Sequence, residues 1–446
     1  MNNREKTDDT GRSGFWGLTP ALVLLATYLL LAVLAGGFSD VPISIAFVVA
    51  SAYGLIIMKG KSIDERIDVF SRRIFRSDIM LMIWIFILAG IFASIARSIG
   101  AVDATVSLTL DLVPARFLPA GIFLASCLLS MAIGTSVGTV VALTPVVAGI
   151  AEETDANTVW MVAIVVGGSF FGDNLSFISD TTIAATQSQG CNMRDKFWAN
   201  LKLALPAAVI VMTIYATRDL ETGVTVSEYN GWLSVPYMIV IVISALGVNV
   251  LLALFLGIMA VLVTGLLTGT PFAGMMTASG QGVQSMAELI VITMLAGGLI
   301  GVITELGGFR FLLQQMTKHV SGKRTAQFFV VVLTAVTNLC TANNTIAIIT
   351  TGNIARDIAS KYGIEPKRMA SILDTTSCVV QGLIPYGVQL LMAASLASIS
   401  PVNIIPYCYY PFALAAMLVL TILFSKFQPK GTDTRKVALL TFIILV

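Results

Sequence analysis

Residues 248–267 read VNVLLALFLGIMAVLVTGLL, and they lie inside a longer stretch, Tyr229–Ala287, that contains no charged residue. A helix needs about 20 apolar residues to cross the hydrocarbon core of a bilayer, and this segment has that length. Similar uncharged runs recur along the chain, at Ile79–Ala96, Phe117–Ala151, Thr325–Ala355 and Thr375–Ser425. The sequence therefore predicts an all-α polytopic membrane protein surrounded by a lipid bilayer.

The composition of the 446 residues supports this class. Hydrophobic residues make up 56% and charged residues 12%, whereas about a quarter of the residues in a typical soluble protein are charged. The 27 basic and 25 acidic side chains nearly balance, so no nucleic-acid partner is expected. Soluble enzymes and DNA-binding proteins are excluded, and no cofactor is expected. Five scattered cysteines have no metal-binding spacing and are interpreted as packing residues; they are Cys127, Cys191, Cys340, Cys378 and Cys408.

The apolar runs fall into two halves of similar shape. At an offset of 207 residues, Leu88-Ala89-Gly90 corresponds to Leu295-Ala296-Gly297, and Gly100 corresponds to Gly307. We therefore predict two repeats with about ten transmembrane spans in total. The predicted order is a cytoplasmic N-terminal tail 1–17, repeat 18–217, an extracellular linker 218–231, repeat 232–425 and a C-terminal tail 426–446.

The positions of the Lys and Arg residues test this predicted topology, because short cytoplasmic loops of membrane proteins carry an excess of positive charge. With both termini in the cytoplasm, all Lys and Arg residues fall inside except Arg97, Arg116 and Arg218. The basic segment 59–78 then lies inside and its uncharged counterpart 268–285 outside, so the repeats are predicted to be inverted. Inverted repeats are typical of secondary transporters, whose sites lie near the bilayer midplane. The expected location is the cell (inner) membrane.

Two uncharged runs, 117–151 and 325–355, are long for one span and short for two. We interpret them as re-entrant helical hairpins with tips at Gly134-Thr-Ser-Val-Gly-Thr139 and Thr341-Ala-Asn-Asn-Thr345. Non-helical backbone at that depth is tolerated where it is buried in protein or lines a watery cavity. Its oxygen atoms can replace the water around a small cation. The alternative is that these small residues only allow close helix packing.

A polar segment interrupts the run 158–188, which we predict to be a broken helix. It reads Phe171-Gly-Asp-Asn-Leu-Ser-Phe-Ile-Ser-Asp-Thr-Thr182 and contains two carboxylates, Asp173 and Asp180. A charged side chain at the bilayer centre costs at least ~2.5–3.5 kcal/mol, so intramembrane acids are functional by default. The alternative is that both acids are hydrogen-bonded structural groups.

The second half contains a matching broken helix, 369–398, with an acid at Asp374 followed by three hydroxyl side chains. No Lys, Arg or His is expected inside a span, and the one histidine, His319, falls in a predicted cytoplasmic loop. Asp173, Asp180 and Asp374 therefore have no expected cationic partner in the membrane. Burial favours the protonated form of a carboxyl group and a nearby cation favours the charged form, so one group can bind a proton or a sodium ion in turn.

The predicted function is exchange of monovalent cations, sodium above all, for protons. Asp173 and Asp180 are the candidates for binding cation and proton, and Asp374 is a partner from the second half. Sodium is expected to bind at these acids and at neighbouring oxygen ligands; the candidates are Thr135, Ser136, Asn174, Ser176, Ser179, Thr181, Asn343, Asn344, Thr345 and Thr375. The alternative is sodium- or proton-coupled exchange of a small organic acid or amino acid.

Two other classes were considered. Aspartyl intramembrane proteases require Gly-x-Gly-Asp, but Phe170-Phe171-Gly172 precedes Asp173, and serine or zinc types would need a membrane histidine. A passive channel uses the same coordinating groups, but inverted repeats with paired hairpins favour a carrier. We therefore expect a transporter and not an enzyme.

The motifs resemble the NhaC family of sodium/proton antiporters, in the ion transporter superfamily. The first tip is similar to the family's Gly-Thr-Ser-x-Gly-Thr element. Phe171–Thr182 is similar to its Phe-Gly-Asp-x-Leu-Ser-Pro-x-Ser-Asp-Thr-Thr signature, with Phe177 in place of proline. The resemblance extends from about residue 20 to 425. It implies sodium/proton antiport, a transport domain that moves against a scaffold, and a homodimer.

The second half departs from the family pattern. Its tip, Thr341–Thr345, is similar to the Ser-Asn-Thr tips of sodium-coupled carboxylate carriers in the superfamily. The family's Glu-Asp-Ser and Ile-Pro-Trp elements correspond to Leu373-Asp374-Thr375 and Ile384-Pro385-Tyr386. These departures affect the prediction of the substrate, because some relatives exchange organic acids or amino acids.

Overall fold

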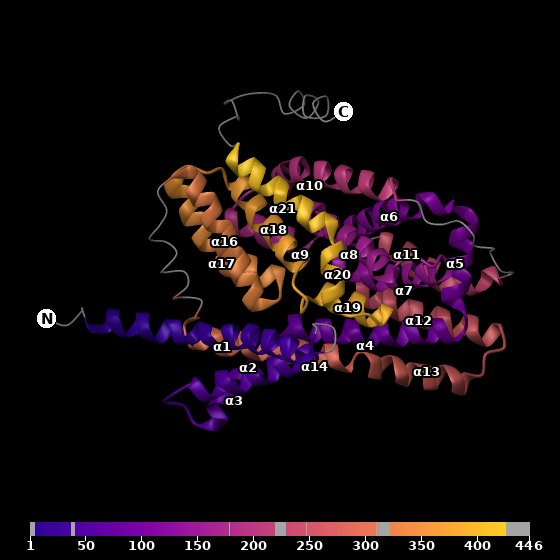
Figure 1. Ribbon diagram of the computed structural model, residues 1–446, viewed down its shortest axis with the longest axis horizontal. Coiled ribbons are helices and arrows are strands. Elements are labelled where there is room, and N and C mark those ends of the chain that lie inside the picture. Colours follow the sequence, from indigo (N-terminus) through magenta and orange to yellow (C-terminus); the bar gives the residue numbers. More distant parts are fainter. Residues whose placement is uncertain are drawn as a thin grey trace.

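Helices dominate the computed structural model, which describes residues 5–36, 41–177, 179–218, 229–246, 248–308, 311 and 322–424 (Figure 1). No strand occurs in these ranges, which confirms the predicted all-α class. In chain order the α-helices are α1 (Glu5–Ala35), α2 (Ile43–Ile57), α3 (Ile63–Ile74), α4 (Ser77–Ser98), α5 (Ala101–Leu112), α6 (Leu118–Ile133), α7 (Ser136–Glu153), α8 (Thr158–Leu175), α9 (Asp180–Gln189), α10 (Met193–Ala216), α11 (Val235–Ala245), α12 (Val250–Leu267), α13 (Phe272–Ser285), α14 (Ala287–Glu305), α16 (Lys323–Thr341), α17 (Asn344–Tyr362), α18 (Pro366–Gln381), α19 (Val388–Ala397), α20 (Pro401–Ile404) and α21 (Tyr409–Leu423).

Some predictions concern residues outside the described ranges. They are His319, the C-terminal tail 426–446, the first four residues of the N-terminal tail and residues 219–228 of the linker. These expectations stay predictions.

Apolar helices confirm a multi-pass membrane protein. In the described ranges, eight helices are long and apolar enough to cross a membrane, or nine if α19 and Pro401–Tyr407, bent by 105°, form one span. Four shorter apolar helices fall below that length, among them α2, α6 and α21. The predicted total of about ten spans, the re-entrant hairpins, the particular membrane and the cytoplasmic termini stay predictions.

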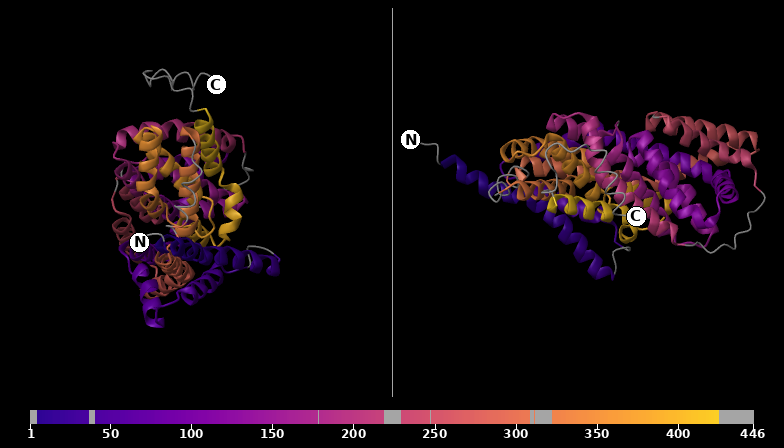
Figure 2. Two further views of the ribbon diagram at one scale, coloured as in Figure 1. Left: turned by 90° about the vertical axis from the view of Figure 1, so that its left-hand side faces the viewer. Right: turned by 90° about the horizontal axis from the view of Figure 1, so that it is seen from above.

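The helices form two layers. Figure 1 shows α1–α4, α13 and α14 beneath a bundle that includes α6, α8, α10, α16–α18 and α21, and the side view in Figure 2 separates the same layers. In the lower layer, α3 packs on α14 and α13 packs along α4. In the bundle, α8 packs between α6 and α7, and α18 contacts α16, α17 and α9. The segment 268–285, expected as an outside connection, contains all of α13.

The helices of the two halves begin at matching positions. Helix α2 begins at Ile43 and α12 at Val250, 207 positions later; α7 begins at Ser136 and α17 at Asn344, 208 positions later. The same spacing relates α8 to α18 and α9 to α19. The predicted hairpin tips fall in the gaps between α6 and α7 and between α16 and α17.

Left-handed backbone conformations recur at the same spacing. Gly134, with φ 76°, ends α6, and Ala342, with φ 48°, ends α16. Three further pairs are Gly100 with Gly307, Asp155 with Gly363, and Gly190 with Ser398. Such φ values favour glycine, so the non-glycine member of a pair is held there by its surroundings.

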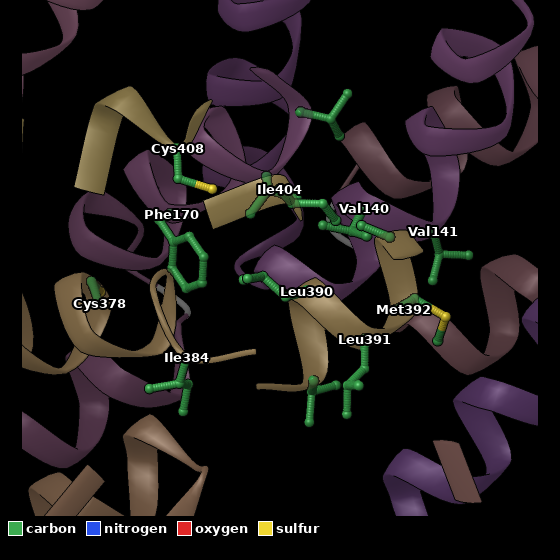
Figure 3. Packing of buried hydrophobic residues seen from close by; sticks show 14 of the residues in the cluster. Val140, Val141, Phe170, Cys378, Ile384, Leu390, Leu391, Met392, Ile404 and Cys408 are labelled. Atoms are coloured by element: carbon green, nitrogen blue, oxygen red, sulfur yellow. The ribbon is translucent and has the colours of Figure 1, made fainter. Parts of the chain in front are cut away.

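Buried apolar residues from both halves form one core in the bundle. Figure 3 shows part of it, where Val140 of α7, Phe170 of α8 and Leu390 of α19 gather. Cys378 and Cys408 are unpaired and buried in the same core, in line with a packing role. This core surrounds the breaks between α8 and α9 and between α18 and α19.

Helices α4 and α13 cross with their backbones in direct contact. A Cβ atom added at Gly282 would lie 2.2 Å from the carbonyl oxygen of Gly90, which cannot move aside as a side chain can. We expect Gly282→Ala to destabilise the fold by about 1–3 kcal/mol, as overpacking does. The measurement is the melting temperature of purified protein. Gly280→Ala in the same helix is the control, because a Cβ there meets nothing within 4 Å; equal melting temperatures would contradict the prediction.

Candidate functional site

Asp173 lies at the meeting point of the two tips. Its side chain is 4% exposed near the end of α8, where the helix breaks before Ser176. The backbone N–H of Ser136 donates to Oδ1 at 2.8 Å, and the Ser136 hydroxyl donates to Oδ2 at 2.5 Å. Asn344 Nδ2, from the second tip, donates to Oδ2 at 3.4 Å. Because Ser136 begins α7, the carboxylate occupies the end of a helix where free N–H groups and the helix dipole favour a negative charge.

A second buried carboxylate, Asp374, lies in the middle of α18 and is completely buried. Its Oδ2 accepts hydrogen bonds from Asn200 Nδ2 at 2.8 Å and Asn174 Nδ2 at 3.4 Å. Asn174 also donates to the Thr375 hydroxyl at 3.1 Å. Since Asn174 follows Asp173 directly in α8, it links the two carboxylate sites.

Lys196 corrects one expectation from the sequence. The Lys196 ammonium lies 2.6 Å from Asp374 Oδ2, and the side chain is 1% exposed. The prediction that Asp374 has no cationic partner was therefore wrong. It failed because the apolar run begins only at residue 203, whereas α10 already begins at Met193. Lys196 thus belongs to the helix, and its long side chain extends into the bundle.

Side chains from α10 also hold the break between α8 and α9. The Asn174 carbonyl, left without a helical partner at the end of α8, accepts from Lys196 Nζ and from Asn200 Nδ2, both at 2.8 Å. The Thr181 hydroxyl donates to the Asp173 carbonyl at 3.1 Å from the other side of the break. The Phe177 ring, where the NhaC signature has proline, stacks on Phe197 of α10 with centroids 4.8 Å apart.

Several predicted residues lie apart from the two carboxylate clusters. Asp180 begins α9 with an exposed side chain, and Ser179 pairs with Thr181 at 2.8 Å. Ser176 is buried at the end of α8. The remaining candidates are half-buried at their own tips, where Asn343 caps α17; they are Thr135, Asn343 and Thr345. The structure thus brings Ser136, Asn174, Thr181, Asn344 and Thr375 to the two carboxylates.

Four polar residues of the site were missed from sequence. Gln389 Nε2 donates to the Ser136 hydroxyl at 2.8 Å, and Gln381 Nε2 donates to Gln389 Oε1 at 3.1 Å. Lys196 and Asn200 are the other two. Their spacing of four residues, continued by Leu203, marks one face of a helix and could have revealed them. Gln381 falls 208 positions after Asp173, so the second half has a neutral amide where the first has the acid.

Comparison with known proteins identifies the family. The model of the Na+/H+ antiporter family matches residues 12–218 and then residues 215–427, so both halves match in turn. The chain belongs to the Na+/H+ antiporter family. Membership confirms the expected class, a membrane transporter of the antiport type, and confirms sodium/proton antiport at the level of the family.

Named relatives agree with the resemblance seen in the motifs. The Na(+)/H(+) antiporter NhaC of Alkalihalophilus pseudofirmus is 23% identical, over 85% of this chain and 89% of the relative. The Na(+)/H(+) antiporter NhaC of Bacillus subtilis is 22% identical, over 76% and 83%. The Malate-2H(+)/Na(+)-lactate antiporter of Bacillus subtilis is 21% identical, over 90% and 93%. The predicted NhaC relationship of this Na+/H+ antiporter family member is confirmed.

Proposed function

We propose that this chain exchanges sodium ions for protons and that the Asp173 carboxylate binds the two in turn. The observation that carries the proposal is the difference between the two buried acids. Asp374 is paired with Lys196, whereas in the described part of the chain Asp173 receives only neutral donors, from Ser136 and Asn344. A buried carboxylate without a fixed cation needs a proton or a metal ion to offset its charge.

Oxygen atoms around Asp173 suit a sodium ion. Sodium, like other hard cations, is bound through oxygen, and carboxylate, hydroxyl and amide oxygens are present here. The Asp173 carboxylate and the Ser136 hydroxyl are adjacent. The buried Oδ1 atoms of Asn174 and Asn200, whose amide groups donate to Asp374, have no hydrogen-bond partner in the described residues. We propose these atoms as sodium ligands, and Asp180, exposed at the start of α9, as a charge that attracts cations toward the site.

The transport cycle is proposed to move the bundle against the lower layer, in the manner of an elevator. A hollow lies between the layers, with Met82 of α4 and Ile292 of α14 on one side and Asn343 of the second tip on the other. Inverted repeats are part of this proposal. They are supported by the matching helix positions and by the reciprocal packing of α3 on α14 and α13 on α4. The homodimer stays a prediction.

The test uses purified protein in liposomes that contain a pH dye. Sodium is added outside with no organic solute present, and choline serves as the control. Proton movement that depends on sodium is the expected result. No response to sodium from folded, reconstituted protein would contradict the proposal.

A second candidate function rests on the hollow beside the second tip. Thr341, Asn343 and Tyr386 line it, so hydroxyl and amide groups face this hollow. The relative named as a malate and lactate antiporter shows that the family's relatives include carriers of organic acids. In the same liposomes, sodium-dependent proton movement that begins only when malate, lactate or an amino acid is supplied would favour this candidate.

Ser136→Ala tests the assignment of ligands. The change removes the hydroxyl that bonds to Asp173 and accepts from Gln389, but it keeps the backbone N–H. Hydrogen bonds to charged groups contribute about 1.5–3 kcal/mol, so we expect the sodium concentration for half-maximal transport to rise at least about tenfold. Ser126→Ala is the control, because this buried hydroxyl bonds only within α6. An unchanged sodium requirement in Ser136→Ala would exclude the hydroxyl as a ligand.

A further inference from the structure

Three charged side chains are buried in the ranges that the structure describes: Asp173, Asp374 and Lys196. All three belong to the candidate site, and two of them form an ion pair. At neutral pH their formal charges add up to one negative charge. The other Asp, Glu, Lys and Arg side chains whose exposure the structure describes are at least partly exposed and can be screened by solvent or lipid headgroups.

Lys196 is held by three oxygen atoms. An ammonium group has three N–H donors, and Lys196 Nζ has three oxygen partners. They are Asp374 Oδ2 and the Thr182 hydroxyl, each at 2.6 Å, and the Asn174 carbonyl at 2.8 Å. The partners come from α18, from α9 and from the end of α8, so the ammonium is fixed on three sides.

Asp173 has different surroundings. Its described hydrogen-bond partners are the backbone and hydroxyl of Ser136 and the amide of Asn344, none of which carries a charge. Asp374 and Lys196 cancel one another, so the negative charge of the site is that of Asp173. One bound sodium ion or one bound proton makes the site neutral.

We propose that Lys196 is the resident counter-ion of Asp374 and thereby fixes the stoichiometry at one sodium ion per proton. The inference rests on the proposed function. Sodium leaves the Asp173 carboxylate on one side of the membrane and a proton occupies the same carboxylate for the return, so both loaded forms are neutral. The empty form has a buried, uncompensated charge, whose movement through the bilayer is costly. Exchange is therefore obligatory, and a cycle moves no net charge.

The first experiment measures the stoichiometry in wild-type protein. Proteoliposomes with a set sodium gradient are exposed to a series of pH gradients, and the pH gradient that stops net proton movement is recorded. Potassium and valinomycin set the membrane potential to zero or to about 60 mV. We expect a tenfold sodium gradient to be balanced by about one pH unit at both potentials.

The possible results separate the inference from the function. If one net charge crossed per cycle, a potential of about 60 mV would shift the balancing pH gradient by about half a unit for two protons per sodium ion, or by about one unit for two sodium ions per proton. If the pH gradient that stops net proton movement (the balance point) changed with the membrane potential, the inference would be overturned and sodium/proton exchange would stay intact. Absence of any sodium-dependent proton movement would overturn the proposed function, and the inference with it.

The second experiment tests the role of the ion pair. Lys196→Met and Asp374→Asn each leave one buried charge without its partner, and each is expected to lower transport at least about tenfold. The double variant, Lys196→Met with Asp374→Asn, restores the net charge of the site. We expect it to recover transport to within about threefold of wild type, with the same balance point. A double variant that melts like wild type but does not transport would show that the pair itself carries ions, and would overturn the inference.

Discussion

Asp173→Asn is expected to abolish sodium-dependent proton movement while the protein stays folded. Asparagine has nearly the same shape, and its amide oxygen can still accept from the backbone N–H of Ser136, while its amide nitrogen takes the place of the oxygen that accepts from the Ser136 hydroxyl. The carboxylate charge, however, is the only one in the described site without a charged partner. Without it, the site cannot release a proton, and a sodium ion would enter a buried site with no net charge to offset its own. The measurement is the liposome assay, with the signal falling to that of empty liposomes.

Asp180→Asn is the matched control for this prediction. It removes the same charge seven positions later, but from an exposed side chain at the start of α9. Exposed charges contribute about 0–1 kcal/mol, so sodium affinity should change by no more than about fivefold. If Asp173→Asn transports and Asp180→Asn does not, the two acids have exchanged roles and the proposed site is wrong.

Lys196→Met is expected to cause the largest loss of stability among the changes considered. The methionine side chain keeps most of the apolar length but leaves the Asp374 charge with neutral groups alone among its described partners, such as the amides of Asn174 and Asn200. Breaking a buried ion pair by removing one partner costs roughly 3–5 kcal/mol, because the other charge stays buried. The measurement is the melting temperature in detergent, on the same preparations that are used for transport.

The double variant with Asp374→Asn provides the control for stability. Replacing both partners removes the unpaired charge, so most of the lost stability should return. Lys202→Met, on the same helix but with an exposed side chain, should leave the melting temperature nearly unchanged. If Lys196→Met melts like wild type, Lys196 is not held by the contacts described here.

Much of the fold could be predicted from the sequence, because the bilayer imposes a simple rule on composition. Uncharged runs of about 20 residues marked the helices, and glycine-rich polar segments marked the gaps between them. Gly134 ends α6 with a left-handed conformation, as its place in a predicted tip suggests. The lengths of single helices were harder to predict, since α6 and α21 are too short to count as spans by length alone.

The candidate site could be predicted only in part. Asp173 was found because an acid within an apolar run is costly and therefore conspicuous. Lys196 was missed for the opposite reason, since it lies in a polar stretch before the apolar run and only its long side chain reaches the interior. Gln381 and Gln389 were missed because uncharged amides do not stand out in composition. Helix packing decides which of these polar side chains contact one another, and a single sequence does not reveal that packing.

The Asn174 carbonyl at the end of α8, which accepts two hydrogen bonds, has a consequence for the rate of ion binding. Lys196 and Asn200 both donate to the Asn174 carbonyl, so the gap between α8 and α9 is held open before any ion arrives. A site prepared in this way requires little reorganisation on binding, and affinity is not lost to ordering the chain. The arrival of an ion is then limited by the exchange of its hydration water for protein oxygens, a step much faster than the slow collective motion of helices.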